Sequence, residues 1–174
     1  SKGKNGIEYR SVWKDLKDGS LGSLSVYLGK MFHCERICTF EQTEEDLYSC
    51  TDEWCADTIH PLKENMQHLT WIEMMPWIEA HKPGNVTIIE NVSSIKKTNP
   101  ELYKALKVFD AETVVTGQLT YRGEDPGFWL VVNPPLENLQ DVAAVFQTFF
   151  YLVGNLFHNK DTIEQLKDIG FTDK

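Results

Sequence analysis

The chain has 174 residues, 41% hydrophobic and 25% charged, which is enough to bury a core without disulfides or metals. Its formal net charge of -9 argues against binding nucleic acid or anionic lipid, since both require a positively charged surface. No run of about 18 apolar residues occurs, so we expect no membrane contact by this chain. These properties predict a cytoplasmic domain.

Four cysteines occur within 22 residues of one another, at Cys34, Cys38, Cys50 and Cys55. They are too sparse for a disulfide scaffold, so we expect reduced thiols that pack as small apolar residues. Cys34 and Cys38 have a spacing that zinc knuckles use, but they run from a helix end into a strand, where side chains alternate between faces, so no metal site is predicted. Zinc binding or a redox switch on a shared hairpin stays open as an alternative.

The first half of the chain predicts two helices, a β-hairpin and a further helical region. Apolar spacing and turn signals place these elements, in chain order, at residues 7–17, 20–32, 34–41, 47–54 and 58–82. Pro76 is expected to break the last region in two, because proline disrupts a helix interior.

The second half predicts three strands, a short helix and a long helix. They are a strand over 86–92, a helix from about 99, strands over 114–121 and 128–132 separated by a turn over 122–127, and a helix over 139–169. Asn99 and Asn138 are expected to cap the two helices. This order predicts an α+β fold: a central antiparallel sheet of five or six strands, flanked by N-terminal helices and a long C-terminal helix.

Three segments of the sequence resemble the GAF domain. Residues 28–40 look like the entry helix and first strand, and residues 114–119 with 127–133 look like the paired fourth and fifth strands. The third segment is the terminal helix, which ends at residues 163–174. The resemblance implies a sensory domain without catalytic residues, over residues 1–160, followed by a signalling helix over 161–174.

The last three residues, Thr172-Asp173-Lys174, look like the junction that precedes a GGDEF domain in many bacterial proteins. The resemblance therefore implies a bacterial signalling protein whose output domain is a diguanylate cyclase that makes c-di-GMP. Two alternatives remain. The domain could be a ligand-free relay, or a cysteine-dependent reductase of the GAF fold that acts on free methionine sulfoxide.

In GAF domains a small ligand lies between the sheet and the helical connections around the third strand. The corresponding region here is rich in aromatic residues, and apolar walls with a few polar groups suit a ligand site. The predicted pocket residues are Trp54, Trp71, Trp77, Glu90, Tyr103 and Phe109. These aromatics could instead be ordinary core. We expect no cofactor, because His33-Cys34 reverses the order of the cysteine and histidine that bind bilin in related domains, and the Asp-x-Pro chromophore motif is missing. An unidentified small-molecule effector stays open as an alternative.

The long last helix carries apolar residues at heptad spacing, which is typical of helix pairing. It predicts a homodimer through the terminal helices. The residues assigned to that contact are Phe149, Val153, Leu156, Ile163 and Leu166.

Overall fold

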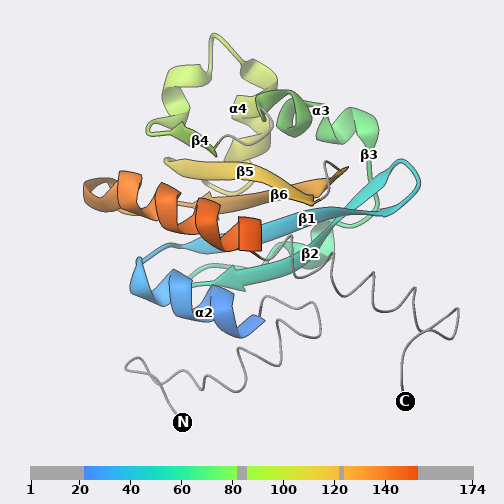
Figure 1. Cartoon of the computed structure of the whole chain (residues 1–174). Helices are drawn as coiled ribbons and strands as arrows, with labels where there is room; N and C mark the ends of the chain where they lie inside the picture. The colour runs from blue at the N-terminus through green and yellow to red at the C-terminus, as the bar shows by residue number, and fades with distance from the viewer. Residues whose placement is uncertain (1–21, 82–85, 122–123, 153–174) are drawn as a thin grey trace, which may run out of the picture.

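The computed structural model of the chain describes residues 22–81, 86–121 and 124–152. It contains a six-stranded sheet in the order β3-β2-β1-β6-β5-β4, in which every neighbouring pair is antiparallel (Figure 1). The strands are β1 Arg36–Glu44, β2 Leu47–Cys55, β3 Leu69–Thr70, β4 Val86–Ile89, β5 Val114–Tyr121 and β6 Glu124–Val132. The predicted α+β fold with a central antiparallel sheet is confirmed.

Strand β6 lies in the middle of the sheet because its sequence is apolar on both faces. Residues 128–132 are all buried, and they pair with β1 on one side and β5 on the other. Such a continuous apolar run is typical of a strand covered on both faces. The hairpin of β1 and β2 turns at Asp46, whose φ of 61° is a conformation that Asp tolerates in turns.

The described helices are α2 (Gly22–Met31), α3 (Trp71–Ala80), α4 (Pro100–Lys107) and a C-terminal helix described over residues 139–152. Three short 3₁₀ turns accompany them: η1 (Lys63–Asn65), η2 (Val92–Ile95) and η3 (Leu136–Asn138). As predicted, Asn99 caps α4: its side chain accepts a hydrogen bond from the Leu102 amide, and Pro100 is the first helical residue. No described helix has the length and apolarity that a membrane crossing needs.

The sheet separates two hydrophobic cores. α2 and the C-terminal helix cover one face, which Figure 1 shows in blue and orange, and we call the core beneath them the first core. α3 and α4 cover the other face over the second core. Alternate residues of each strand enter opposite cores, as the period of two requires: Ile37, Trp129 and Val131 belong to the first core, and Cys38, Phe40, Phe128 and Leu130 to the second.

Two sequence predictions are wrong in the region that leads to the second core. Helix α3 continues through Pro76 instead of ending there. A capping box at Thr70 sets the start of α3, and proline removes only the bond to the carbonyl of Ile72, a residue that is 79% exposed to water. Part of the predicted helical region instead forms η1 and β3, a sixth strand.

Two strand boundaries also differ from the prediction. Strand β6 begins at Glu124, so the connection to β5 is shorter than the predicted turn over 122–127. Strand β4 ends at Ile89, because the chain then turns at Asn91, whose side chain accepts from the Ser93 amide and caps η2. The predicted helix over 7–17 and the helix beyond residue 152 lie outside the described residues.

Candidate functional site

A pocket of about 240 Å³ opens between α3 and α4 and reaches the face of the sheet that carries the second core. Its walls are apolar and rich in aromatic and methionine side chains. The lining residues are Phe40, Asn65, Met66, Leu69, Glu73, Met74, Trp77, Ala105, Val108 and Phe109. We call it the α3–α4 pocket.

Aromatic rings set the shape of the α3–α4 pocket. Phe40 stacks on Phe128 with ring centroids 4.9 Å apart, and Trp77 stacks on the same ring at 5.2 Å. Phe109 meets both Phe40 and Trp77 edge to face, at 6.4 and 6.0 Å. All four side chains are buried and each contacts two of the others, so the floor of the pocket is a continuous apolar surface.

Of the residues that line the pocket, only Glu73 carries a charge. Its carboxylate is held in place by the capping box of α3, where it accepts hydrogen bonds from the Thr70 amide at 2.7 Å and the Thr70 hydroxyl at 3.1 Å. Asn65 supplies the remaining polar side chain at the rim. This electrostatic arrangement favours a ligand that is neutral or positively charged over an anion.

A buried ion pair supports the pocket from below. Arg36 and Glu53 lie 2.6 Å apart, and each side chain is only 5% exposed. The Arg36 guanidinium also lies over the ring of Phe109, 5.6 Å from its centroid. The Glu53 carboxylate accepts bonds from the backbone amides of Leu62 and Lys63. The pair therefore positions both the aromatic floor and the segment that leads to Asn65 and Met66.

His81 follows the last turn of α3 and is buried behind the aromatic floor. Its ring stacks on Phe128 at 5.3 Å, and its Nε2 atom lies 2.7 Å from the Thr116 hydroxyl on β5. Burial lowers the pKa of His81 to about 4, although a hydrogen bond to the Trp77 backbone acts in the opposite direction. His81 is therefore neutral at pH 7 and joins the end of α3 to the sheet.

The structure brings only part of the predicted pocket together. Trp77 and Phe109 line the α3–α4 pocket, and Tyr103 packs against the same core without lining it. Trp71 is 48% exposed beside β3, and Glu90 is exposed. Trp54 lies on the opposite side of the sheet, against the first core, where its ring packs closely on Gly29.

Sequence reasoning missed several lining residues. Phe40 could have been found from strand alternation, because it lies two residues after Cys38 on the same face of β1. Met66 and Leu69 could not have been found in this way, because they lie in the segment that was predicted to be helical. Their position depends on the backbone bonds to Glu53 rather than on a periodic pattern.

All four cysteines are free, and Cys34, Cys38 and Cys50 are buried as expected. Cys38 and Cys50 share a hydrogen bond in the second core, whereas Cys34 belongs to the first core on the other side of the sheet. Burial raises the pKa of Cys34 to about 12 and that of Cys55 to about 11. None of these thiols lines the α3–α4 pocket, and the described residues contain no group suited to hold a metal ion.

The residues predicted for a dimer contact lie mostly beyond the described part of the last helix. Phe149 is half-buried and packs on Phe150, with ring centroids 4.8 Å apart. The other four, Val153, Leu156, Ile163 and Leu166, lie outside the described residues.

Solved structures identify the fold. The blue-light absorbing form of the PixJ GAF domain of Thermosynechococcus elongatus is 11% identical with a TM-score of 0.59, over 91% of this chain and 96% of that one. A GAF domain/HD domain protein of Geobacter sulfurreducens is 14% identical with a TM-score of 0.62, over 85% of this chain and 95% of that one. No family model and no curated sequence matches. The chain therefore has the GAF fold.

These neighbours correct the expectation that a domain of this kind has no cofactor. The far-red absorbing domain JSC1_58120g3 was solved with bound biliverdin IXα. It is 10% identical to this chain with a TM-score of 0.57, over 87% of this chain and 98% of that one. NpR6012g4 is likewise described as a red/green cyanobacteriochrome. The missing sequence signals, the reversed His33-Cys34 order and the absent Asp-x-Pro, were not sufficient grounds for expecting no cofactor.

Proposed function

We propose that this chain is a non-catalytic sensory domain that binds a small, flat, apolar molecule in the α3–α4 pocket. The observation that carries the proposal is the pocket itself, which opens onto a buried aromatic floor between two helices and the sheet. Ligand sites are typically concave and apolar with a few polar groups, and this pocket meets that description. The GAF fold, which serves light sensing in several neighbours, supports a sensory role.

The pocket also indicates the chemistry of its ligand. Its 240 Å³ lies just below the usual range of about 300–1,000 Å³ for ligand sites, and Trp77 and Phe109 offer ring faces and edges for stacking. Glu73 at the rim would accept a hydrogen bond from an N–H group. We therefore expect a ligand of one or two fused rings with an N–H or amine group.

A linear tetrapyrrole is larger than this pocket and would require α3 and α4 to separate. The stacked rings of Trp77 and Phe128 occupy the sheet face that a larger chromophore would need. A thioether bond would also require a thiol at the pocket, and no cysteine lines it. Biliverdin IXα is nevertheless a necessary probe, because a neighbour with the same fold binds it.

The likeness of residues 172–174 to the junction before a GGDEF domain supports a proposal about the output of this domain. We propose that the domain controls an output domain attached at its C-terminal end, with a diguanylate cyclase as the candidate. Pairing through the terminal helices, with Phe149 in the contact, would transmit a ligand-dependent change. A cysteine-dependent reductase is less well supported, because burial keeps the thiols protonated.

The binding proposal can be tested by NMR with methionine methyl labels and indole as the probe. Met66 and Met74 line the pocket, whereas Met31 lies on α2 over the other face of the sheet. Indole should therefore shift the Met66 and Met74 methyl resonances and leave Met31 unchanged. A parallel titration with biliverdin IXα, followed by visible absorption, tests whether the helices open for a larger molecule.

A blocking variant and a matched control give the test its specificity. Val108→Trp places a large ring at the rim of the pocket and should abolish the indole shifts. Lys104→Trp adds the same side chain to an exposed position on α4 outside the pocket, and it should leave them intact. Equal shifts at Met31, or unchanged binding by Val108→Trp, would exclude the α3–α4 pocket as the site.

A further inference from the structure

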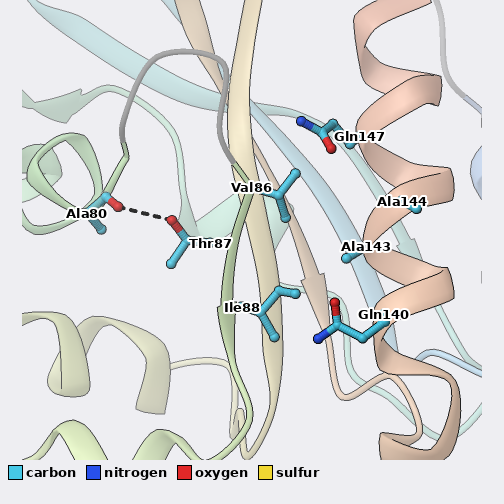
Figure 2. Close-up of a pocket in the computed structure, with 8 residues that line it drawn as sticks. All are labelled: Ala80, Val86, Thr87, Ile88, Gln140, Ala143, Ala144 and Gln147. Atoms are coloured by element: carbon cyan, nitrogen blue, oxygen red, sulfur yellow. Dashed lines mark hydrogen bonds between the residues drawn. The ribbon is translucent and has the colours of Figure 1, made fainter.

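A second concavity runs along the outer edge of strand β4, between the C-terminal helix on one face of the sheet and Ala80 at the end of α3 on the other (Figure 2). Its volume is about 650 Å³. Figure 2 shows Val86 and Ile88 pointing from the strand toward the helix, and Gln140 and Gln147 pointing from the helix toward the strand. Ala143 and Ala144 line the concavity on the helix between the two glutamines. We call this concavity the edge groove.

Among the residues that the structure describes, strand β4 pairs only with β5, so its outer edge is the last edge of the described sheet on this side. Such an edge presents backbone N–H and C=O groups that can pair with another strand. Proteins usually protect an edge by keeping the strand very short, or with charged residues, proline or a bulge. Strand β4 is short, but its four residues, Val86–Ile89, contain no charge and no proline, and their pairing with β5 has no register shift.

The edge groove is also uncharged. None of its eight lining residues carries a charge, although a quarter of the chain is charged and the net charge is -9. Two copies of so acidic a protein repel one another over most of their surfaces. The edge groove is a face at which a second copy can approach without bringing like charges into contact.

The segment that fits this groove must be extended and uncharged, with apolar side chains at alternate positions. Strand β4 itself has these properties, because Val86 and Ile88 pack toward the first core while Thr87 points away to the Ala80 carbonyl. The two glutamines are seven residues apart on the helix, or about 10 Å, which equals about three residues of an extended strand. The Gln140 amide can both donate and accept hydrogen bonds along such a segment.

We propose that the edge groove is an interface between two copies of this chain, in which β4 of each copy pairs antiparallel with β4 of the other. A two-fold axis beside the strand makes the contact self-complementary, so one surface serves both partners. The contact extends the six-stranded sheet across the dimer and places Ala144 and both glutamines beside the incoming strand. It is independent of the proposed ligand pocket, and it differs from pairing through the terminal helices.

Sedimentation velocity over a wide range of concentration tests the proposal with the full 174-residue chain. Ala144 is exposed, and arginine is a good helix former, so Ala144→Arg should fold normally while it places a charge in the groove. We expect this substitution to weaken the dimer about tenfold or more. Thr148→Arg adds the same charge to an exposed position on the same helix outside the groove, and it should leave the dimer unchanged.

A second measurement on the wild-type chain does not depend on any variant. Hydrogen exchange should show that amides of Val86–Ile89 gain protection as the concentration rises. A species larger than a dimer that Ala144→Arg reduces to a dimer would mean that edge and helix contacts coexist, which also supports the proposal. A monomer at all concentrations, or a dimer that resists Ala144→Arg but dissociates in Phe149→Glu, would overturn it. Neither outcome bears on indole binding, so the two proposals fail separately.

Discussion

Acid should destabilise this domain through His81, whose pKa is about 4 in the folded state and 6.5 as an ordinary value. Between these pH values the unfolded chain binds a proton that the folded chain excludes, because the ring is buried against Phe128 and only 8% exposed. The contribution is fully present above pH 6.5 and is lost as pH falls toward 4. Linkage gives a loss of about 2 kcal/mol by pH 5 and about 3 kcal/mol by pH 4.

The assay is urea unfolding at pH 7, 6 and 5, with wild type and His81→Gln compared at each pH. Glutamine stays neutral and retains an amide that can reach Thr116, so the variant should lose this part of the pH dependence. His68→Gln is the control, because it removes an exposed histidine and leaves His81 in place, so this variant should keep the pH dependence that belongs to His81. The same pH dependence in wild type and His81→Gln would show that His81 does not cause the loss of stability in acid.

Three further substitutions test the frame around the sheet. Gly127→Ala should destabilise the fold by about 2 kcal/mol or more, measured by thermal unfolding, because a Cβ there collides with the Phe40 backbone; an unchanged Tm would contradict this. Arg36→Met should lower the free energy of unfolding in urea by about 3–5 kcal/mol, because it leaves the buried Glu53 charge unpaired. A loss below about 1 kcal/mol, as for a surface ion pair, would show that the pair is not buried. Thr70→Ala should cost about 1 kcal/mol by removing the cap of α3, whereas Thr70→Ser should retain most of it.

Much of the fold could be predicted from local sequence signals. The strand Val114–Tyr121 has the predicted bounds, and Asn99 and Pro100 open α4 as their propensities require. These elements have strong local signals that tertiary contacts reinforce. The antiparallel sheet followed from the clustering of strands and short turns in the sequence.

The segment between β2 and α3 could not be predicted, because long-range contacts determine it. The Glu53 carboxylate binds backbone amides of the segment, and the Cys50 amide donates to the Met66 carbonyl. These bonds override the helical spacing of Leu62, Met66 and Leu69. Pairing of Leu69 with Tyr48 then makes β3 a strand of only two residues, which is too short to leave a pattern.

The candidate site was predictable only where an aromatic residue also faced the correct side of the sheet. Trp77 and Phe109 satisfied both conditions, whereas Trp54 is an aromatic residue on the opposite face. A bulge between Thr39 and Phe40 shifts the pairing with β2, so the faces of the two strands could not be matched by counting from the turn. One sequence therefore gives the residue types of a pocket but not their common face.

Native mass spectrometry of the chain purified from cells is the decisive test of whether the α3–α4 pocket holds a small molecule. We expect a mass excess that survives gentle ionisation and disappears on denaturation, and that is absent from Val108→Trp. A bare wild-type chain under gentle conditions, or an excess that Val108→Trp retains in full, would contradict this expectation.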